Sequence, residues 1–237
     1  MSDVLEFAAG RTARLGVDVR RVLSVGLGVI DGIAVGPGDT IAPLTAARST
    51  ALRDLYAGRL PSEIEPLQEA RTLYKSVGIQ PTRTRPSSEA LLRRVLKGQD
   101  LYAISNAVDV CNLASLEFLL PLGLYDLSCI RGDVTFRLGR AGEAYPGIRK
   151  GPVHLEGRLG LFDDEGPFGS PTSDSPRTSV TGDTTRLLVA IMATAAYPRE
   201  RMRAHVARFV ELTTTHCGGR GVFGGLLPDD GASAVGV

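Results

Sequence analysis

The sequence is short of the residues that mark several common classes of protein. It has no tryptophan, 5% aromatic residues and three cysteines among its 237 residues. The cysteines, Cys111, Cys129 and Cys217, lie far apart and form no C-x-x-C pair. This spacing disfavours a disulfide framework and a zinc site, and it favours a reduced, cytoplasmic protein. The core must be built mainly from Val, Leu, Ile and Ala.

An excess of charge and a long apolar run are also missing. The net charge of +1 argues against a protein coated in positive charge, such as a nonspecific nucleic-acid binder, but leaves room for a local basic patch. No run of about 18 apolar residues occurs, so we expect no membrane-spanning helix. The first residues show no apolar run after a basic segment, so we also expect no signal peptide.

Motifs for dinucleotide binding, metal binding and histidine-based catalysis are not found. "GLGVIDG" (26–32) departs from G-x-G-x-x-G because residue 31 is Asp, and glycines of strands and turns are the simpler interpretation. On one helix, His205 and His216 would lie about 16 Å apart, too far to share a metal ion. G-x-S-x-G is absent. We therefore predict neither a Ser-His-Asp mechanism nor a cofactor.

Length and patterning predict one large α+β domain. The composition, 43% hydrophobic and 22% charged, is that of a globular protein with a sizeable core. Helices are predicted over 43–58, 62–78, 87–98, 106–123 and 199–216, and strands within 17–35, 132–140, 153–164 and 186–195. Helices followed by strands indicate an α+β fold rather than a doubly wound one. The polar segment 164–184 is predicted to be a functional loop without regular structure, and residues 224–237 a loose tail.

One stretch of the chain concentrates positive charge. Residues 71–97 hold seven Lys and Arg residues against a single acidic residue, Glu89, which gives a local charge of +6. Ser87 is the predicted N-cap of the helix 87–98, and Arg83 and Arg85 precede the helix end that favours anions. Two interpretations remain open: a solvated helix surface, or a surface that faces the phosphates of RNA.

A set of motifs points to a known family. "RPSSEALLRR" (85–94), "VDVCNLASLE" (108–117), "PLGLYDL" (121–127) and "IRGDV" (130–134) occur in this order. Together they resemble the tRNA-editing B3/B4 domain of the β-subunit of bacterial phenylalanyl-tRNA synthetase, and in particular free-standing proteins made of this domain alone. The resemblance covers about residues 70–195. It implies a single domain, with a strand and helix extension over 1–69 and a C-terminal helix and tail over 196–237.

The resemblance also implies a fold and a function. The expected fold is α+β, with a helical layer against a mostly antiparallel sheet and a pocket between them. The expected partner is tRNA, with no DNA or membrane partner and no cofactor. The expected activity is hydrolysis of the ester of a mischarged aminoacyl-tRNA, without the ability to charge tRNA, because the aminoacylating core of the synthetase has no counterpart here. The alternative is a noncatalytic module that binds RNA or a small ligand.

Site residues follow from the same resemblance. Ester hydrolysis needs a placed water, donors for the oxyanion and a pocket for the amino-acid side chain. A histidine and a glutamate of the synthetase pocket align with Gly123 and Pro176, so the catalytic groups are expected to be Asp174, Arg177 and Thr178. The residues expected to bind the substrate are Arg83, Arg85, Ser87, Ser88, Glu89, Asn112, Gly123 and Tyr125. Those expected to bind tRNA are Arg93, Arg94 and Lys97.

Overall fold

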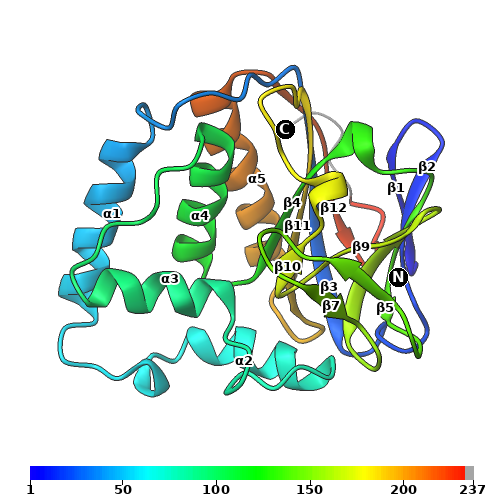
Figure 1. Cartoon of the computed structure of the whole chain (residues 1–237), viewed down its shortest axis with the longest axis horizontal. Helices are drawn as coiled ribbons and strands as arrows, with labels where there is room; N and C mark the ends of the chain where they lie inside the picture. Colours follow the sequence, from blue (N-terminus) through cyan, green and yellow to red (C-terminus); the bar gives the residue numbers. More distant parts are fainter. Residues whose placement is uncertain (233–237) are drawn as a thin grey trace.

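The computed structural model describes residues 1–232 and shows two sheets beside a group of helices (Figure 1). Every neighbouring pair in the four-stranded sheet is antiparallel; its order is β12 (Arg220–Leu227), β3 (Leu23–Asp31), β11 (Arg186–Thr194), β4 (Leu122–Asp126). The six-stranded sheet has the order β1 (Val4–Ala8), β2 (Arg11–Leu15), β5 (Val134–Leu138), β8 (Leu159–Asp163), β9 (Gly166–Ser170), β10 (Ser173–Asp174). Its β2–β5 pair is parallel and its other pairs are antiparallel. The α+β prediction is confirmed.

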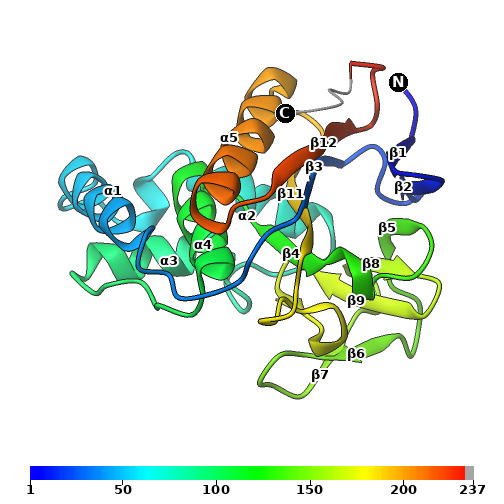
Figure 2. The ribbon, with the colours of Figure 1, turned by 90° about the horizontal axis from the view of Figure 1, so that it is seen from above.

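Most of the helices form a layer on one side of the four-stranded sheet and a group beyond it (Figures 1 and 2). The long helix α5 (Arg199–Cys217) packs against β3 and β12, and α4 (Asn106–Phe118) packs against α5. The helix α2 (Leu67–Ser76) packs against β11 on the opposite face of the sheet, and α1 (Ala42–Leu55) and α3 (Ser87–Leu96) lie farther out. A small hairpin, β6 (Ala144–Pro146) with β7 (Pro152–His154), extends from the six-stranded sheet. Within residues 1–232, no helix has the length and apolar character needed to cross a bilayer.

The four-stranded sheet is buried on both faces. Side chains of a strand alternate between faces, so neighbouring residues of β3 and β11 enter two different cores. Val25 and Leu27 pack with the six-stranded sheet and α2. Val189 and Ile191 pack with α4 and α5. This double burial explains why both strands read as nearly continuous apolar runs.

Gly26 and Gly28 of "GLGVIDG" belong to β3 and bring α5 close to the sheet, whereas Gly32 follows the strand at a turn with φ +76°. A Cβ at Gly26 would lie 2.7 Å from Val206 and 2.9 Å from Met202, both side chains of α5. A Cβ at Gly28 would lie 3.0 Å from Val189 of the neighbouring strand β11 and 3.6 Å from Val206 of α5. The interpretation of these glycines as strand and turn residues is confirmed, and the missing side chains of the two strand glycines leave room for the helix.

Several predicted boundaries differ from the structure. The segment 62–78 holds a short 3-10 turn (Pro61–Glu63), and α2 begins only after Pro66, so Ser62 does not cap it. Pro86, not Ser87, occupies the N-cap position of α3. The helix predicted over 106–123 ends at Phe118, because the chain turns into β4, which pairs with β11.

Two segments predicted to lack structure are largely ordered into elements. The segment 164–184 contains β9, β10 and a 3-10 turn, η3 (Pro176–Thr178). Residues 224–227 are the end of β12, paired with β3, rather than a loose tail. Glycine-rich strands carry little pattern of their own, and pairing with a buried neighbour decides their conformation. Residues 233–237, the rest of the predicted tail, lie outside the described residues.

Candidate functional site

A cavity of about 430 Å³ opens between α3, α4, β4 and the segment 174–180. We call it the Asp174 cavity. It lies between helices and sheet, where a pocket is expected. Its polar lining consists of Ser87, Cys111, Asn112, Ser115, Arg149, Asp174 and Ser179. Its apolar lining includes Leu91, Val108, Leu122, Leu124 and Val180. An apolar wall with a few converging polar groups is typical of a small-ligand site.

Buried hydroxyl groups hold the chain next to Asp174. Asp174 ends β10, the short edge strand that pairs with β9. The Tyr145 hydroxyl lies 2.5 Å from the backbone oxygen of Ser173 and donates to it. The Tyr74 hydroxyl donates to the backbone oxygen of Pro171. The carboxyl group is thus presented from a braced turn rather than from a free loop.

The surroundings of Asp174 raise the pKa of its carboxyl group. Burial raises its pKa to about 7, although interaction with the Tyr125 hydroxyl and the charge of Lys150 lower it. Its Oδ1 atom is buried and has no hydrogen-bond partner among residues 1–232. A carboxyl group that changes protonation near pH 7 inside a cavity is suited to general acid–base chemistry.

Tyr125 lies beneath Asp174 between two glycines. A Cβ at Gly123 or at Gly169 would collide with the Tyr125 hydroxyl, so both positions must lack a side chain. Burial raises the pKa of Tyr125 well above its ordinary value, so the phenol stays protonated and faces the carboxylate as a potential donor. Its oxygen meets no acceptor in good geometry within the described chain. Gly123 therefore makes room for Tyr125 rather than shaping the cavity surface.

Cys111 is a nucleophilic side chain in the lining of the cavity, but it is not activated. Burial raises the pKa of its thiol to about 12, and the charge of Asp174 adds to the effect. Because the thiolate is the reactive form, this thiol is inert at neutral pH. A bound water, activated by Asp174, is the nucleophile that the arrangement can supply.

A second hollow of about 470 Å³ runs along α3 next to the Asp174 cavity. We call it the basic groove, because four cations, Arg85, Arg93, Arg94 and Lys97, line it. The ring of Tyr102 lines it as well. Ser87, Leu91 and Asn112 line both the groove and the cavity. The predicted tRNA-binding residues Arg93, Arg94 and Lys97 thus line one groove, which adjoins the cavity.

Glu89 is the buried carboxylate of an ion-pair cluster that links α2 and α3, and its arginine partners are partly exposed. Its side chain is 1% exposed and lies 2.7 Å from Arg71, 2.9 Å from Arg93 and 3.5 Å from Arg85. Burial raises the pKa of Glu89, but hydrogen bonds from Arg71 and Arg93 outweigh this and hold it below its ordinary value. Neither Glu89 nor the buried Ser88 lines the cavity. The predicted substrate-binding role of these two residues is not supported by their positions.

Three other predicted residues also lie away from the cavity. Arg177 points toward β8 and the β8–β9 turn, with Asp163 at 2.8 Å and Glu165 at 3.2 Å, so it cannot meet an oxyanion next to Asp174. Thr178 is fully buried outside the lining, and Arg83 is exposed and lines neither the cavity nor the groove. No group of three or more His, Cys, Asp or Glu residues in the described part of the chain could hold a metal ion.

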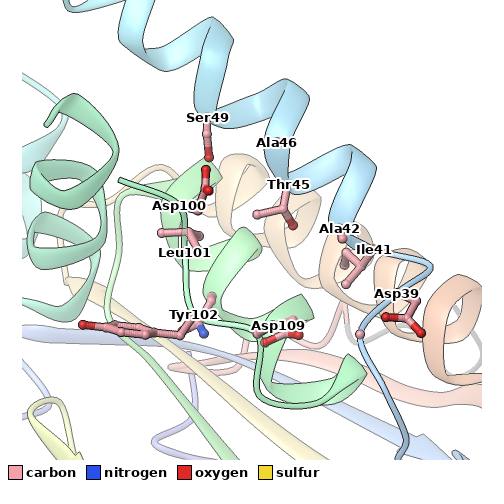
Figure 3. A pocket seen from close by; sticks show the side chains of 13 residues that line it. Asp39, Ile41, Ala42, Thr45, Ala46, Ser49, Asp100, Leu101, Tyr102 and Asp109 are labelled. Carbon is pink, nitrogen blue, oxygen red and sulfur yellow. The ribbon is translucent and has the colours of Figure 1, made fainter. Parts of the chain in front are cut away.

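A third hollow, about 310 Å³, lies between α1, α4 and the connection 100–103 (Figure 3). We call it the acidic pocket. Figure 3 shows Ser49 and Thr45 of α1 facing Asp100 across it. Asp39 and Asp109 complete its acidic lining, which contains no Lys or Arg. Unlike the basic groove, this pocket disfavours a phosphate and suits a neutral or cationic group.

Asn112 lies where the three hollows meet. It lines the Asp174 cavity, the basic groove and the acidic pocket. Its side chain makes no hydrogen bond to another described residue, whereas Asn106 of the same helix binds the backbone of Ala34, Gly36 and His216. Asn106 therefore ties down the neighbouring loops, and the amide of Asn112 is free to bind a ligand.

Four residues that line these hollows are not recognisable as site residues from sequence patterns. They are Cys111, Arg149 and Ser179 of the Asp174 cavity and Tyr102 of the basic groove. Tyr102 carries the one recognisable signal, since an aromatic residue stands in the polar connection after the basic helix. The other three come from α4, from the β6–β7 turn and from the segment after η3. Only the folded chain brings these segments together.

The comparisons with known proteins agree with the motifs. The family model described as the B3/4 domain matches residues 69–214, more than half of the chain. The chain belongs to the B3/4 domain family. The match extends from α2 to α5, so it includes the Asp174 cavity and the basic groove but leaves out α1.

Two phenylalanine–tRNA ligase beta subunits are similar to this B3/4 protein. The subunit of Ralstonia nicotianae is 24% identical over 152 residues, 63% of this chain and 19% of that subunit. The subunit of Chromobacterium violaceum is 36% identical over 80 residues, 33% of this chain and 10% of that subunit. The chain thus spans less than a fifth of the length of either curated relative.

A solved structure is also similar. It is an N-terminal fragment of the phenylalanyl-tRNA synthetase beta-subunit from Pyrococcus horikoshii. The comparison covers 97% of this chain and 58% of that chain, with 12% sequence identity and a TM-score of 0.46.

Proposed function

We propose that this B3/4 protein binds tRNA and hydrolyses the ester bond of a mischarged aminoacyl-tRNA. One observation carries the proposal: the Asp174 carboxyl group, whose Oδ1 atom is buried without a hydrogen-bond partner among residues 1–232, lines a cavity that adjoins a basic groove. The groove offers cations for the phosphates at the end of a tRNA. The cavity offers an apolar wall for an amino-acid side chain and a base for water.

In the proposed reaction, ionised Asp174 accepts a proton from a water molecule held beside it. The water attacks the ester carbonyl carbon, and the ester oxygen leaves as the ribose hydroxyl after the proton is returned to it. The oxyanion needs donors that point at it before the reaction. The Asn112 amide and the Ser87 hydroxyl, which line both the cavity and the groove, are the proposed donors.

A noncatalytic binding module is the second candidate. It is favoured by Gly123 and Pro176 in place of the polar pair that the resemblance leads one to expect, and by Arg177, which is engaged with Asp163. Such a module would use the same groove and cavity but would leave the ester intact. Binding and hydrolysis must therefore be measured separately.

A panel of mischarged tRNAs tests the proposal. We expect the pure protein to release the amino acid from at least one of them, and we expect tRNA affinity to fall steeply as salt rises, because phosphate contacts displace counterions. Arg94→Ala with Lys97→Ala should make this salt dependence shallower. Salt-dependent binding with no hydrolysis of any member would reject the enzyme in favour of the binding module.

Asn112→Leu separates a ligand-binding amide from a structural one. The amide lines three hollows and holds no described loop, so the variant should lose about tenfold in affinity for tRNA, or more, while its melting temperature changes little. Asn106→Leu is the matched control on the same helix and should lower the melting temperature, since it breaks three backbone contacts. A destabilised Asn112→Leu with normal affinity would contradict this assignment.

A further inference from the structure

The basic groove contains an aromatic ring that the hydrolysis does not use. Tyr102 is 59% exposed, unusual for a large aromatic side chain. The guanidinium group of Arg94 lies 4.1 Å from the ring centroid, and its Nη1 is 3.0 Å from the Tyr102 hydroxyl. Arg94 also donates to the backbone oxygen of Asp100, in the same connection. The ring is therefore held in place by a cation on one side.

We propose that Tyr102 is a stacking platform for the nucleobase at the 3′ end of an RNA, and that Arg93, Arg94 and Lys97 contact the phosphates next to it. Aromatic rings combined with a positively charged groove are the usual means of binding single-stranded nucleic acid. Arg94 covers one side of the ring, so the base would complete a three-layer stack of guanidinium, phenol and base. This inference rests on the proposed function for the position of the ester.

The neighbouring hollows define the direction of the bound strand. Tyr102 lines both the basic groove and the acidic pocket, so it stands at the border between them. The acidic pocket disfavours a phosphate, and this places the neutral base on the Tyr102 side and the phosphates along α3. Ser87 and Asn112 lie between the groove and the Asp174 cavity. A terminal ribose near these two residues would direct its aminoacyl group toward Asp174.

The test uses uncharged tRNA with the fluorescent base 2-aminopurine in place of its 3′-terminal adenine. Stacking on an aromatic ring should quench this fluorophore when the protein binds. Tyr102→Phe keeps the ring, and Tyr102→Leu keeps an apolar side chain without it. We expect Tyr102→Phe to bind and quench like the wild type, and Tyr102→Leu to lose both the quenching and about tenfold in affinity. The matched control is Lys75→Ala, which removes an exposed cation outside the groove and should change neither.

Competition by adenosine monophosphate distinguishes the end of an RNA from a free nucleotide, and comparison of quenching with deacylation distinguishes the stacking platform from the proposed hydrolysis. Adenosine monophosphate should compete at least a hundredfold more weakly than tRNA, because it lacks the neighbouring phosphates. Equal competition would overturn the assignment to an RNA end.

The stacking platform would be overturned if quenching were lost equally in Tyr102→Phe and Tyr102→Leu, or retained in both. Because the tRNA is uncharged, quenching by a protein that deacylates nothing would reject the proposed hydrolysis while supporting the platform.

Discussion

Replacement of Asp174 by asparagine should lower the deacylation rate about a hundredfold or more, the usual contribution of a general base. Asparagine has almost the same shape and keeps a polar group in the cavity, but it cannot accept a proton from water. The braced turn of β10 should remain intact, because the hydroxyls of Tyr74 and Tyr145 bind backbone atoms and not the Asp174 side chain. Single-turnover hydrolysis of the tRNA identified by the panel measures the loss.

The pH dependence should identify the same group. With a pKa of about 7, Asp174 is mostly protonated in weak acid, so kcat/KM of the wild type should rise with pH and level off above about pH 7. The asparagine variant should show no such rise. Asp164→Asn, at an exposed carboxylate in the β8–β9 turn, is the matched control and should retain the wild-type rate and profile. A rate for Asp174→Asn within twofold of the wild type would remove Asp174 from the chemistry.

The same substitution should stabilise the fold. The folded-state pKa of Asp174 lies above the unfolded value of about 4, so its stabilising contribution is complete below pH 4 and is lost as pH rises through about 7. Asp174→Asn removes this loss. Its gain in unfolding free energy should grow between about pH 4 and 7 and reach about 1–3 kcal/mol. Chemical denaturation at several pH values measures it, and a destabilised variant at pH 8 would contradict the assigned burial.

Glu89→Gln should cost about 1–3 kcal/mol of unfolding free energy, because the charged acceptor of the hydrogen bonds from Arg71 and Arg93 becomes a neutral amide. Glu89 is 1% exposed and contacts Arg71, Arg85 and Arg93. Its pKa is lowered in the fold, so its stabilising contribution is present above the unfolded value of about 4.3 and is lost as pH falls through the folded value. The difference between wild type and variant should therefore shrink in acid.

An exposed ion pair provides the comparison for Glu89. Glu211, 65% exposed, pairs with Arg208 on the surface of α5, and Glu211→Gln should cost less than about 1 kcal/mol. Urea unfolding at pH 7 distinguishes the two variants. If Glu89→Gln lost no more unfolding free energy than Glu211→Gln, the Glu89 ion pairs would not be what joins α2 to α3.

The sequence predicts the elements that have a clear periodicity and a clear end. The strand 186–195 and the helix 199–216 match β11 and α5 within one residue at each end, since their apolar patterns are strong. β12 escapes prediction, because "GGLL" becomes a strand only when it pairs with β3. Local pattern describes short-range preferences, whereas strand pairing is decided by residues far away in the chain.

In the candidate site too, the sequence predicts some residues, and contacts between distant segments decide the rest. Asp174 is found from an aligned motif, and its cavity requires α4, β4 and the β6–β7 turn to meet. Arg177 is three residues from Asp174 and looks equally suitable in the sequence. Its guanidinium is engaged by Asp163, a residue of β8, and no spacing rule reveals that contact. Proximity in sequence therefore identifies the segment but not the direction of each side chain.

The Tyr125 ring and its two glycines make three positions mutually dependent. Any side chain at position 123 would collide with the Tyr125 ring in its present place, so a residue larger than glycine there requires the ring to move or to be replaced. A larger residue at position 169 meets the same obstacle from the neighbouring sheet. Substitutions at these sites should therefore be non-additive: the stability lost in Gly123→Ala should be partly restored when Tyr125 is replaced by a smaller residue in the same chain. The packing of one ring thus makes the effect of a residue at position 123 depend on the residue at position 125.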